Sequence, residues 1–224
     1  MSSTKPAWSS VVLQGSTNHL ADQRPIEDDW GRSPLAHVKP SIGSTSFVDI
    51  PGFSLTELAL RGHLILRCGA HDVQQHLNAA HILGGALPLT PLSCVDHGDS
   101  TLCWLGPDEW LITLPNDQTF AVESAFHAQM SGHWSLVNVS GGLTLFRLTG
   151  CRVVDVLKKS TVVDLHEQSF PINKVVTTVF AKTSVTLRRL DAECFDLFVR
   201  RSFADYIWLW LQDASREFGL PSEA

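Results

Sequence analysis

Two stretches of this chain share one pattern, and this internal likeness constrains the fold more than any other feature. They read LILRCGAHDVQQHL in the first half and TLFRLTGCRVVDVL in the second. Each runs from an alternating apolar stretch through Arg and Gly into apolar positions at helical spacing. Each is followed by further strand-like stretches and a final helix-like one. The repetition predicts an α+β fold made of duplicated strand-helix units, with mainly antiparallel sheets and helices on one face.

The same pattern divides the chain into an arm and two lobes. Residues 1–33 are rich in Ser, Asp, Asn and Gln without a clear period, which predicts an extended N-terminal arm. Trp8 and Trp30 within it could anchor the arm onto the body or onto a partner. We expect the first α+β lobe at residues 34–135 and the second at residues 136–224, ending in an aromatic helix.

A helix is predicted after the first apolar strand. The stretch AHDVQQHLNAAHIL repeats apolar residues at the spacing typical of one helical side, and a Gly pair follows it. The residues of that side are Val73, Leu77, Ala80 and Leu83.

Composition and charge exclude some classes of function. The 224 residues carry a formal net charge of −6, and Lys and Arg never cluster beyond a pair, which argues against nucleic-acid binding. No stretch of 18 apolar residues predicts a membrane span, and the N-terminus lacks the apolar core of a signal peptide. We therefore expect a cytoplasmic protein whose five cysteines are reduced thiols. A zinc site of Cys94, Cys103 and His97 is a weaker alternative, because zinc ligands usually show tighter paired spacing.

The acid pair Asp108-Glu109 in LGPDEWLI has two interpretations, a catalytic pair or the polar tip of a turn. Gly-Pro-Asp between two apolar stretches is typical turn chemistry. Neighbouring residues of a strand also point to opposite faces, so the two carboxylates would not converge. We favour the turn, with Trp104 and Trp110 flanking it and packing on the lobe or on a partner.

Motifs for common chemistry are missing. The chain has neither a Gly-rich nucleotide-binding motif nor the Ser elbow of the hydrolases. His71, His76 and His81 recur every five residues, which differs from the spacing of helical zinc ligands. Ser140-Gly141-Gly142 could admit a ligand near the backbone, but a bend entering a strand is the favoured interpretation. The residues thus predict no catalytic, cofactor-binding or metal site.

The closing helix carries six apolar or aromatic residues in a row, from Tyr206 to Leu211. A helix that is apolar nearly all round needs cover on more than one side, from its own fold or from a partner subunit. A membrane-surface helix is a third option, although such helices are usually rich in Lys and Arg. The candidate interface residues are therefore Trp104, Trp110, Tyr206, Trp208 and Trp210.

Five stretches, taken together and in order, resemble the gamma subunit of heterotetrameric sarcosine oxidase. They are RSPLAH (Arg32–His37), LGPDEWLI (Leu105–Ile112), LTGCRVVDVLKKSTVVDL (Leu148–Leu165), FPINKVVTTVFAK (Phe170–Lys182) and FDLFVRRSFADYIWLWLQDAS (Phe195–Ser215). The resemblance covers nearly the whole chain except the N-terminal arm.

The resemblance implies a complex of alpha, beta, gamma and delta subunits that oxidatively demethylates sarcosine to glycine, releases hydrogen peroxide and forms 5,10-methylenetetrahydrofolate. It implies FAD and covalently held FMN with beta, NAD and tetrahydrofolate with alpha, and zinc with delta. Gamma itself is similar in fold to the folate-binding aminomethyltransferase T-protein of the glycine cleavage system.

The catalytic Asp of the aminomethyltransferases has no counterpart in this chain. Their motif places paired acids after a Gly and a strand, whereas the nearest acids here, Asp108-Glu109, belong to the expected turn. The resemblance therefore implies a non-catalytic structural subunit that binds no cofactor itself and packs chiefly on alpha. The alternative is a free-standing folate-binding or one-carbon transfer protein.

Overall fold

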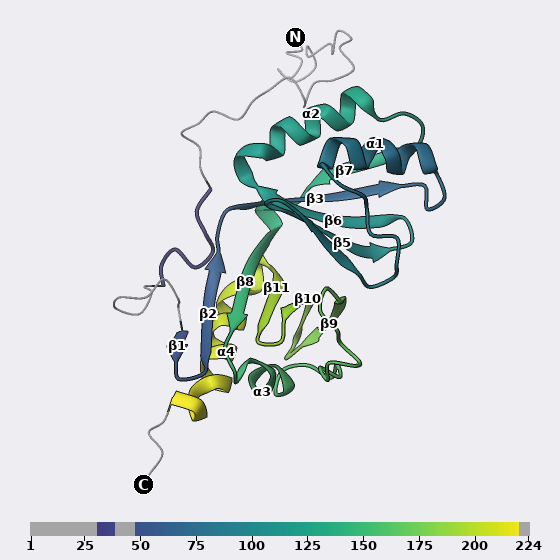
Figure 1. Cartoon of the computed structure of the whole chain (residues 1–224). Helices are drawn as coiled ribbons and strands as arrows, with labels where there is room; N and C mark the ends of the chain where they lie inside the picture. Colours follow the sequence, from purple (N-terminus) through teal and green to yellow (C-terminus); the bar gives the residue numbers. More distant parts are fainter. Residues whose placement is uncertain (1–30, 39–47, 220–224) are drawn as a thin grey trace, which may run out of the picture.

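The computed structural model describes residues 31–38 and 48–219, which form two antiparallel sheets with helices (Figure 1). The six-stranded sheet has the order β1 (Val48–Ile50), β2 (Phe53–Leu58), β8 (Leu143–Thr149), β11 (Cys194–Arg200), β10 (Thr183–Asp191) and β9 (Val175–Phe180). The five-stranded sheet has the order β4 (Cys94–His97), β5 (Ser100–Gly106), β6 (Glu109–Pro115), β3 (Arg61–Cys68) and β7 (Trp134–Asn138). The helices are α1 (Val73–Leu83), α2 (Thr119–Gln129), α3 (Val153–Lys158) and α4 (Ala204–Gly219).

The two halves repeat one arrangement, which confirms the predicted duplicated α+β fold. The chain passes through β3-α1-β4-β5-β6-α2 and then through β8-α3-β9-β10-β11-α4. The sheet orders correspond as well, β4-β5-β6-β3 in one unit and β9-β10-β11-β8 in the other. The two stretches with similar sequence lie at equivalent places, where β3 leads into α1 and β8 leads into α3.

Each unit also receives strands from the segment that precedes the other unit, β1 and β2 in the second unit and β7 in the first. β2 leads into β3 along the chain but pairs with β8, whereas β7 precedes β8 but pairs with β3. The predicted division at residues 135 and 136 is therefore wrong for the sheets, because β1 and β2 belong with the second unit. Of the predicted arm, residues 1–30 lie outside the described residues.

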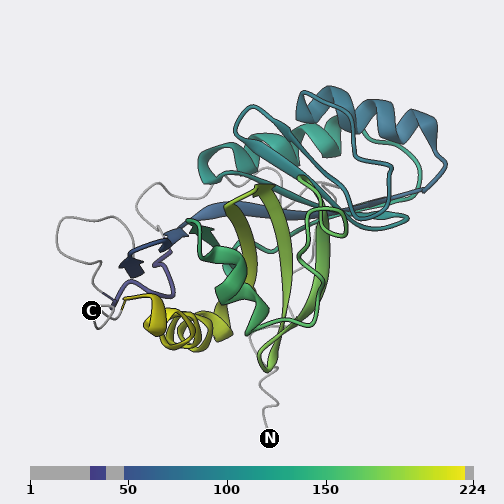
Figure 2. The ribbon, with the colours of Figure 1, turned by 60° about the horizontal axis from the view of Figure 1, so that its bottom comes forward.

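Three apolar clusters follow from this arrangement. One lies between the five-stranded sheet and α1 and α2, and a second lies between the six-stranded sheet and α3 and α4. A third cluster joins the two sheets, with Leu111 of one sheet and Leu145 and Phe198 of the other. Figure 2 shows α1 and α2 on the outer side of their sheet, and α4 beside the other sheet. The helices therefore cover outer faces, as predicted, and the inner faces meet.

Helix α1 turns most of its predicted apolar side outward. Asp72 caps its first turn by accepting a hydrogen bond from the Gln75 backbone N–H, and Gly84 ends it in the left-handed conformation. Val73 is 68% exposed and Leu77 is 59% exposed, while Leu83 is buried. The buried Gln75 amide explains the rotation, because it accepts a hydrogen bond from the Gly69 N–H before the helix and donates one to the Ser131 carbonyl after α2.

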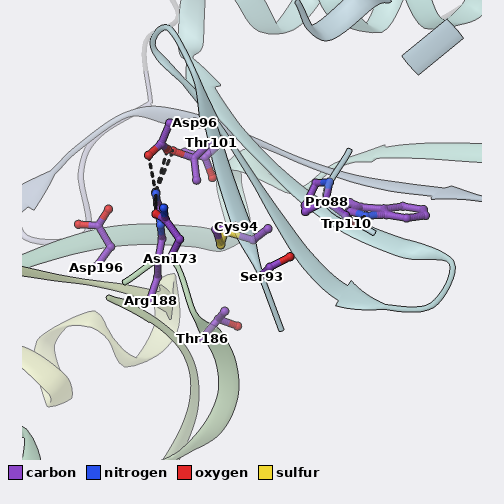
Figure 3. Close-up of a disulfide and its surroundings, with 12 residues drawn as sticks. Pro88, Ser93, Cys94, Asp96, Thr101, Trp110, Asn173, Thr186, Arg188 and Asp196 are labelled. Carbon is purple, nitrogen blue, oxygen red and sulfur yellow. Dashed lines mark hydrogen bonds and ion pairs between the residues drawn. A yellow bond between two sulfur atoms is a disulfide. The ribbon is translucent and has the colours of Figure 1, made fainter. Parts of the chain in front are cut away.

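The prediction of five reduced cysteines is wrong for Cys94 and Cys103, which form a disulfide (Figure 3). They lie directly opposite each other on β4 and β5, with their Cα atoms 4.3 Å apart. The zinc alternative is also wrong, because the two sulfurs bond each other and the His97 Nε2 atom contacts the Ala86 carbonyl. The free cysteines among the described residues are Cys68, Cys151 and Cys194.

Candidate functional site

The acid pair Asp108-Glu109 lies in the turn between β5 and β6, as predicted. Gly106 pairs with Glu109 across the turn, so these four residues reverse the chain. The Asp108 carbonyl accepts a hydrogen bond from the Cys68 backbone N–H. The Glu109 carboxylate is held by the Arg67 guanidinium, with 2.8 Å between Nη2 and Oε2. These contacts assign the pair to the turn rather than to a converging pair of catalytic acids.

The two tryptophans of this hairpin have different environments. The Trp110 side chain is fully buried and donates a hydrogen bond from Nε1 to the Pro88 carbonyl at 2.8 Å. The His76 ring stands edge-on against it. Trp110 is therefore a core residue, and its prediction as an interface residue is wrong. Trp104 is only partly buried, so it stays a candidate.

Helix α4 is covered largely by its own fold. Ile207 and Leu211 are completely buried against the six-stranded sheet. Tyr206, Trp208 and Trp210 pack against the same cluster and remain partly exposed. The Trp210 Nε1 atom donates a hydrogen bond to the Ser160 hydroxyl at 3.0 Å, and the outward-facing Leu209 is 53% exposed. The fold itself thus covers most of the apolar surface of α4. Contact between a partner subunit and the exposed remainder of the helix stays a prediction.

A cleft of about 900 Å³ opens beside the start of α1. It is lined by Arg67, Cys68, Gly69, Ala70, Asp72, Gln75, Pro107, Asp108, His133, Trp134 and Ser135. Burial, followed by the charges of Asp72 and Asp108, raises the pKa of the Cys68 thiol to about 11. The thiol therefore stays protonated at neutral pH and is a poor nucleophile. No motif indicated this cleft, because it joins a strand end, a turn and a loop that are far apart in sequence.

A bidentate ion pair links the two sheets (Figure 3). Arg188 of β10 is 1% exposed, and it donates through Nη1 and Nη2 to the two carboxylate oxygens of Asp96 on β4. Thr101 and Asn173 accept further hydrogen bonds from the same guanidinium. Burial alone would raise the pKa of Asp96, but its hydrogen bonds to Arg188 and Thr101 lower the pKa below its ordinary value. The sequence could not indicate this pair, whose members lie 92 residues apart.

Other buried polar groups are also occupied by internal contacts. Arg147 binds Asp196 through two hydrogen bonds of 2.8 and 2.9 Å. Burial, and then the charge of Arg61, lowers the pKa of His63 to about 4, so that its ring is neutral at pH 7. The His63 Nδ1 atom lies 3.1 Å from the Thr113 hydroxyl. Each of these two contacts joins neighbouring strands of one sheet, and neither directs its groups at an open site.

The described residues contain neither a cluster of metal ligands nor a membrane-spanning helix. Within residues 31–38 and 48–219, no three His, Cys, Asp or Glu side chains gather into a possible metal site. Among the helices of the same residues, none has both the length and the apolar character needed to cross a bilayer.

Comparison with known proteins gives consistent matches. The model of the sarcosine oxidase gamma subunit family matches residues 67–217. Sarcosine oxidase subunit gamma of Corynebacterium sp. (strain U-96) is 28% identical over 188 residues, covering 84% of this chain and 91% of the relative. That of an Arthrobacter species is 29% identical over 197 residues, covering 86% and 94%.

Two solved structures are similar in shape. The heterotetrameric sarcosine oxidase of Corynebacterium sp. U-96, in complex with pyrrole 2-carboxylate, contains a chain that matches with a TM-score of 0.76. The two chains are 27% identical, and the match covers 87% of this chain and 99% of that one. The glycine cleavage system aminomethyltransferase T of Bartonella henselae matches with a TM-score of 0.53 and 11% identity, covering 75% of this chain and 47% of that one. The second match concerns the fold alone, and it confirms the predicted likeness to the aminomethyltransferases.

Proposed function

We propose that this chain, which belongs to the sarcosine oxidase gamma subunit family, is a non-catalytic structural subunit of a heterotetrameric sarcosine oxidase. The observation that carries the proposal is the match of sequence and shape to a chain of such a heterotetramer, over 87% of this chain. The family model, which spans residues 67–217, supports it independently.

The non-catalytic role is supported by the way in which the described polar residues are used. Asp108 and Glu109 shape a hairpin turn, Arg188 holds Asp96, and Arg147 holds Asp196. A catalytic group must reach a reacting atom and hold a suitable protonation state. Glu109 is instead paired with Arg67, and the other two pairs are bound to each other.

The assembled enzyme would be an oxidoreductase acting on the CH-NH group of sarcosine with oxygen as acceptor. It would yield glycine, hydrogen peroxide and methylenetetrahydrofolate in the cytoplasm. FAD, FMN, NAD, zinc and tetrahydrofolate would lie on the alpha, beta and delta subunits, with alpha as the main partner of this chain.

Co-expression with the neighbouring genes tests the subunit role. A tag on this chain should retain larger partners, and the retained material should show the yellow absorbance of a flavin. Adding sarcosine in air should then release hydrogen peroxide. A colourless, lone chain would contradict the proposal.

A second function, binding or transfer of a folate one-carbon unit by the chain itself, is favoured by one observation. The cleft beside α1 has about 900 Å³, within the size range of small-molecule sites, and Trp134 and Arg67 line it. Titration of the purified chain with tetrahydrofolate separates the two functions. Micromolar binding that is lost on Arg67→Ala would establish folate binding in this cleft and refute a purely structural role. Millimolar or weaker binding would refute the second function.

A further inference from the structure

The disulfide lies next to the residues that hold Arg188, on the same face of the β4–β5 hairpin. Cys94 lies opposite Cys103, and two residues further along Asp96 lies opposite Thr101. Alternate residues of a strand share a face, so both pairs face the other sheet. The sulfurs lie in the apolar cluster between the sheets, and Asp96 and Thr101 accept hydrogen bonds from Arg188. The disulfide thus adjoins the ion pair that joins the two units (Figure 3).

Strand β4 is held in place partly by this bond, beside its pairing with β5 and the ion pair of Asp96 with Arg188. It has four residues and is the outermost strand of its sheet. Beyond its pairing with β5, the Cys94 backbone N–H donates to the Asn173 carbonyl of the other unit. A shift of one residue in β4 would turn Asp96 to the opposite face and away from Arg188. The covalent link to Cys103 prevents that shift.

We propose that Cys94 and Cys103 form a redox-sensitive clamp. Hydrogen peroxide closes the disulfide, and the closed disulfide holds Asp96 in contact with Arg188. Reduction by a dithiol opens the bond, frees β4 and weakens the link between the two units. The assignment of the peroxide source rests on the proposed function, because the assembled oxidase would release hydrogen peroxide beside this chain. The clamp would then tighten the subunit when the enzyme is turning over.

The chemistry balances without a further reagent. One thiolate attacks a peroxide oxygen, so that an S–O bond forms, the O–O bond breaks and water leaves. The second thiol displaces the hydroxyl of this sulfenic acid, so that the S–S bond forms and a second water leaves. Both sulfurs are oxidised and the peroxide is reduced. Both cysteines are buried, so the reaction requires brief opening of the short edge strand.

The other described cysteines provide internal controls. Cys68 lies opposite Trp134 of β7 rather than opposite a cysteine, so its position does not favour a disulfide, and burial raises the pKa of its thiol to about 11. Cys151 is exposed, and its oxidation should leave the hairpin unaffected. Cys194 is partly exposed, so a chain carrying both Cys151→Ser and Cys194→Ser isolates the response of the Cys94–Cys103 pair.

The full chain carrying Cys151→Ser and Cys194→Ser is reduced with dithiothreitol, desalted and treated with equimolar hydrogen peroxide. Free thiols are then alkylated and mapped by mass spectrometry. Cys94 and Cys103 should lose alkylation together and appear as one cross-linked peptide. The reduced chain should melt about 5 °C below the oxidised one, as expected for a short disulfide-closed loop in a domain of this size. The Cys94→Ser and Cys103→Ser double variant should melt at the reduced value with or without peroxide.

Thiols that stay alkylatable after peroxide, or equal melting temperatures of the two forms, overturn the clamp. A second arm uses the co-purified complex with sarcosine in air, with and without catalase. If the disulfide closes during turnover and catalase prevents this closure, both the clamp and its peroxide source are supported. Release of peroxide with an open pair overturns the clamp. Closure by added peroxide in a complex that releases none with sarcosine instead contradicts the proposed oxidase and leaves the thiol chemistry intact.

Discussion

Asp96 neutralises an arginine that water cannot reach. Arg188 is 1% exposed, whereas the Asp96 side chain is 50% exposed. Asp96→Asn would leave the guanidinium charged and buried with only neutral acceptors. Removing one partner of a buried pair costs about 3–5 kcal/mol, and the half-exposed carboxylate places this change at or slightly below the lower end. Urea unfolding should show the loss, whereas Asp213→Asn, in an exposed pair with Arg216, should match the wild type. Equal stability of all three proteins would contradict the role of Asp96.

His63 makes the stability of the chain depend on pH. Its pKa is about 4 in the fold and 6.5 when exposed, so the unfolded chain binds the proton more readily. Stability should therefore be constant above pH 6.5, fall as the pH drops below it, and level off near pH 4. Between pH 8 and pH 5, titration of this ring should lower the free energy of unfolding by about 2 kcal/mol. His63→Asn keeps a polar group near Thr113 but does not titrate. Its free energy of unfolding, measured in urea, should therefore fall less over that pH range. Equal losses in the two proteins would show that burial of His63 carries no such cost.

The residues that sequence could and could not predict differ in the range of their contacts. The turn at Asp108-Glu109 was predictable because Gly, Pro and Asp act on their own backbone. The Asp96–Arg188 pair was not, since only the packed sheets bring its members together. The disulfide was missed for the same reason. The spacing of Cys94 and Cys103 is uninformative until the β4–β5 register places them opposite each other.

At the scale of single elements, the β5–β6 hairpin separates a core tryptophan from a candidate surface one. Trp110→Ala would empty a fully buried site and should cost about 3–5 kcal/mol in urea unfolding. Trp104→Ala, at the position paired with it across the hairpin, should cost much less because Trp104 is partly exposed. If Trp104 meets a partner subunit, its variant should keep its melting temperature yet co-purify less of the complex. A destabilised Trp104→Ala chain with unchanged co-purification would remove it from the interface.

Helix α1 shows why a periodic pattern predicts an element better than its orientation. The apolar spacing and the Gly end correctly indicated a helix. The helix carries apolar residues on two sides, with Ala79 and Leu83 inward and Val73 and Leu77 outward. Periodicity alone could not choose between these sides. The choice depends on Gln75, whose buried amide bonds to three backbone groups that lie outside the helix.

At the scale of the whole molecule, the exchange of strands makes each unit depend on a segment that lies elsewhere in the chain. Four residues in the described parts of this segment, 31–38 and 48–58, are buried in the core of the second unit, namely Leu35, Val48, Phe53 and Leu55. At about 1.5–3 kcal/mol each, their burial is worth as much as the whole stability of an ordinary domain, about 5–15 kcal/mol. The repeat in the sequence predicted two units, but it could not show which strands they exchange.

This exchange predicts that residues 143–224 alone do not fold, whereas the same residues fold when 31–58 are joined in front of them. Leu58 pairs with Leu145, so a linker of a few Gly and Ser residues can connect β2 to the start of β8 as a hairpin. The fusion restores β1, β2 and Leu35 to the six-stranded sheet and its core, and it should show one cooperative thermal transition by circular dichroism. The unjoined fragment should show none, and adding residues 31–142 in trans should restore a transition. A cooperative transition of 143–224 by itself would show that the exchanged strands are not required, and the two units would then fold as separate domains.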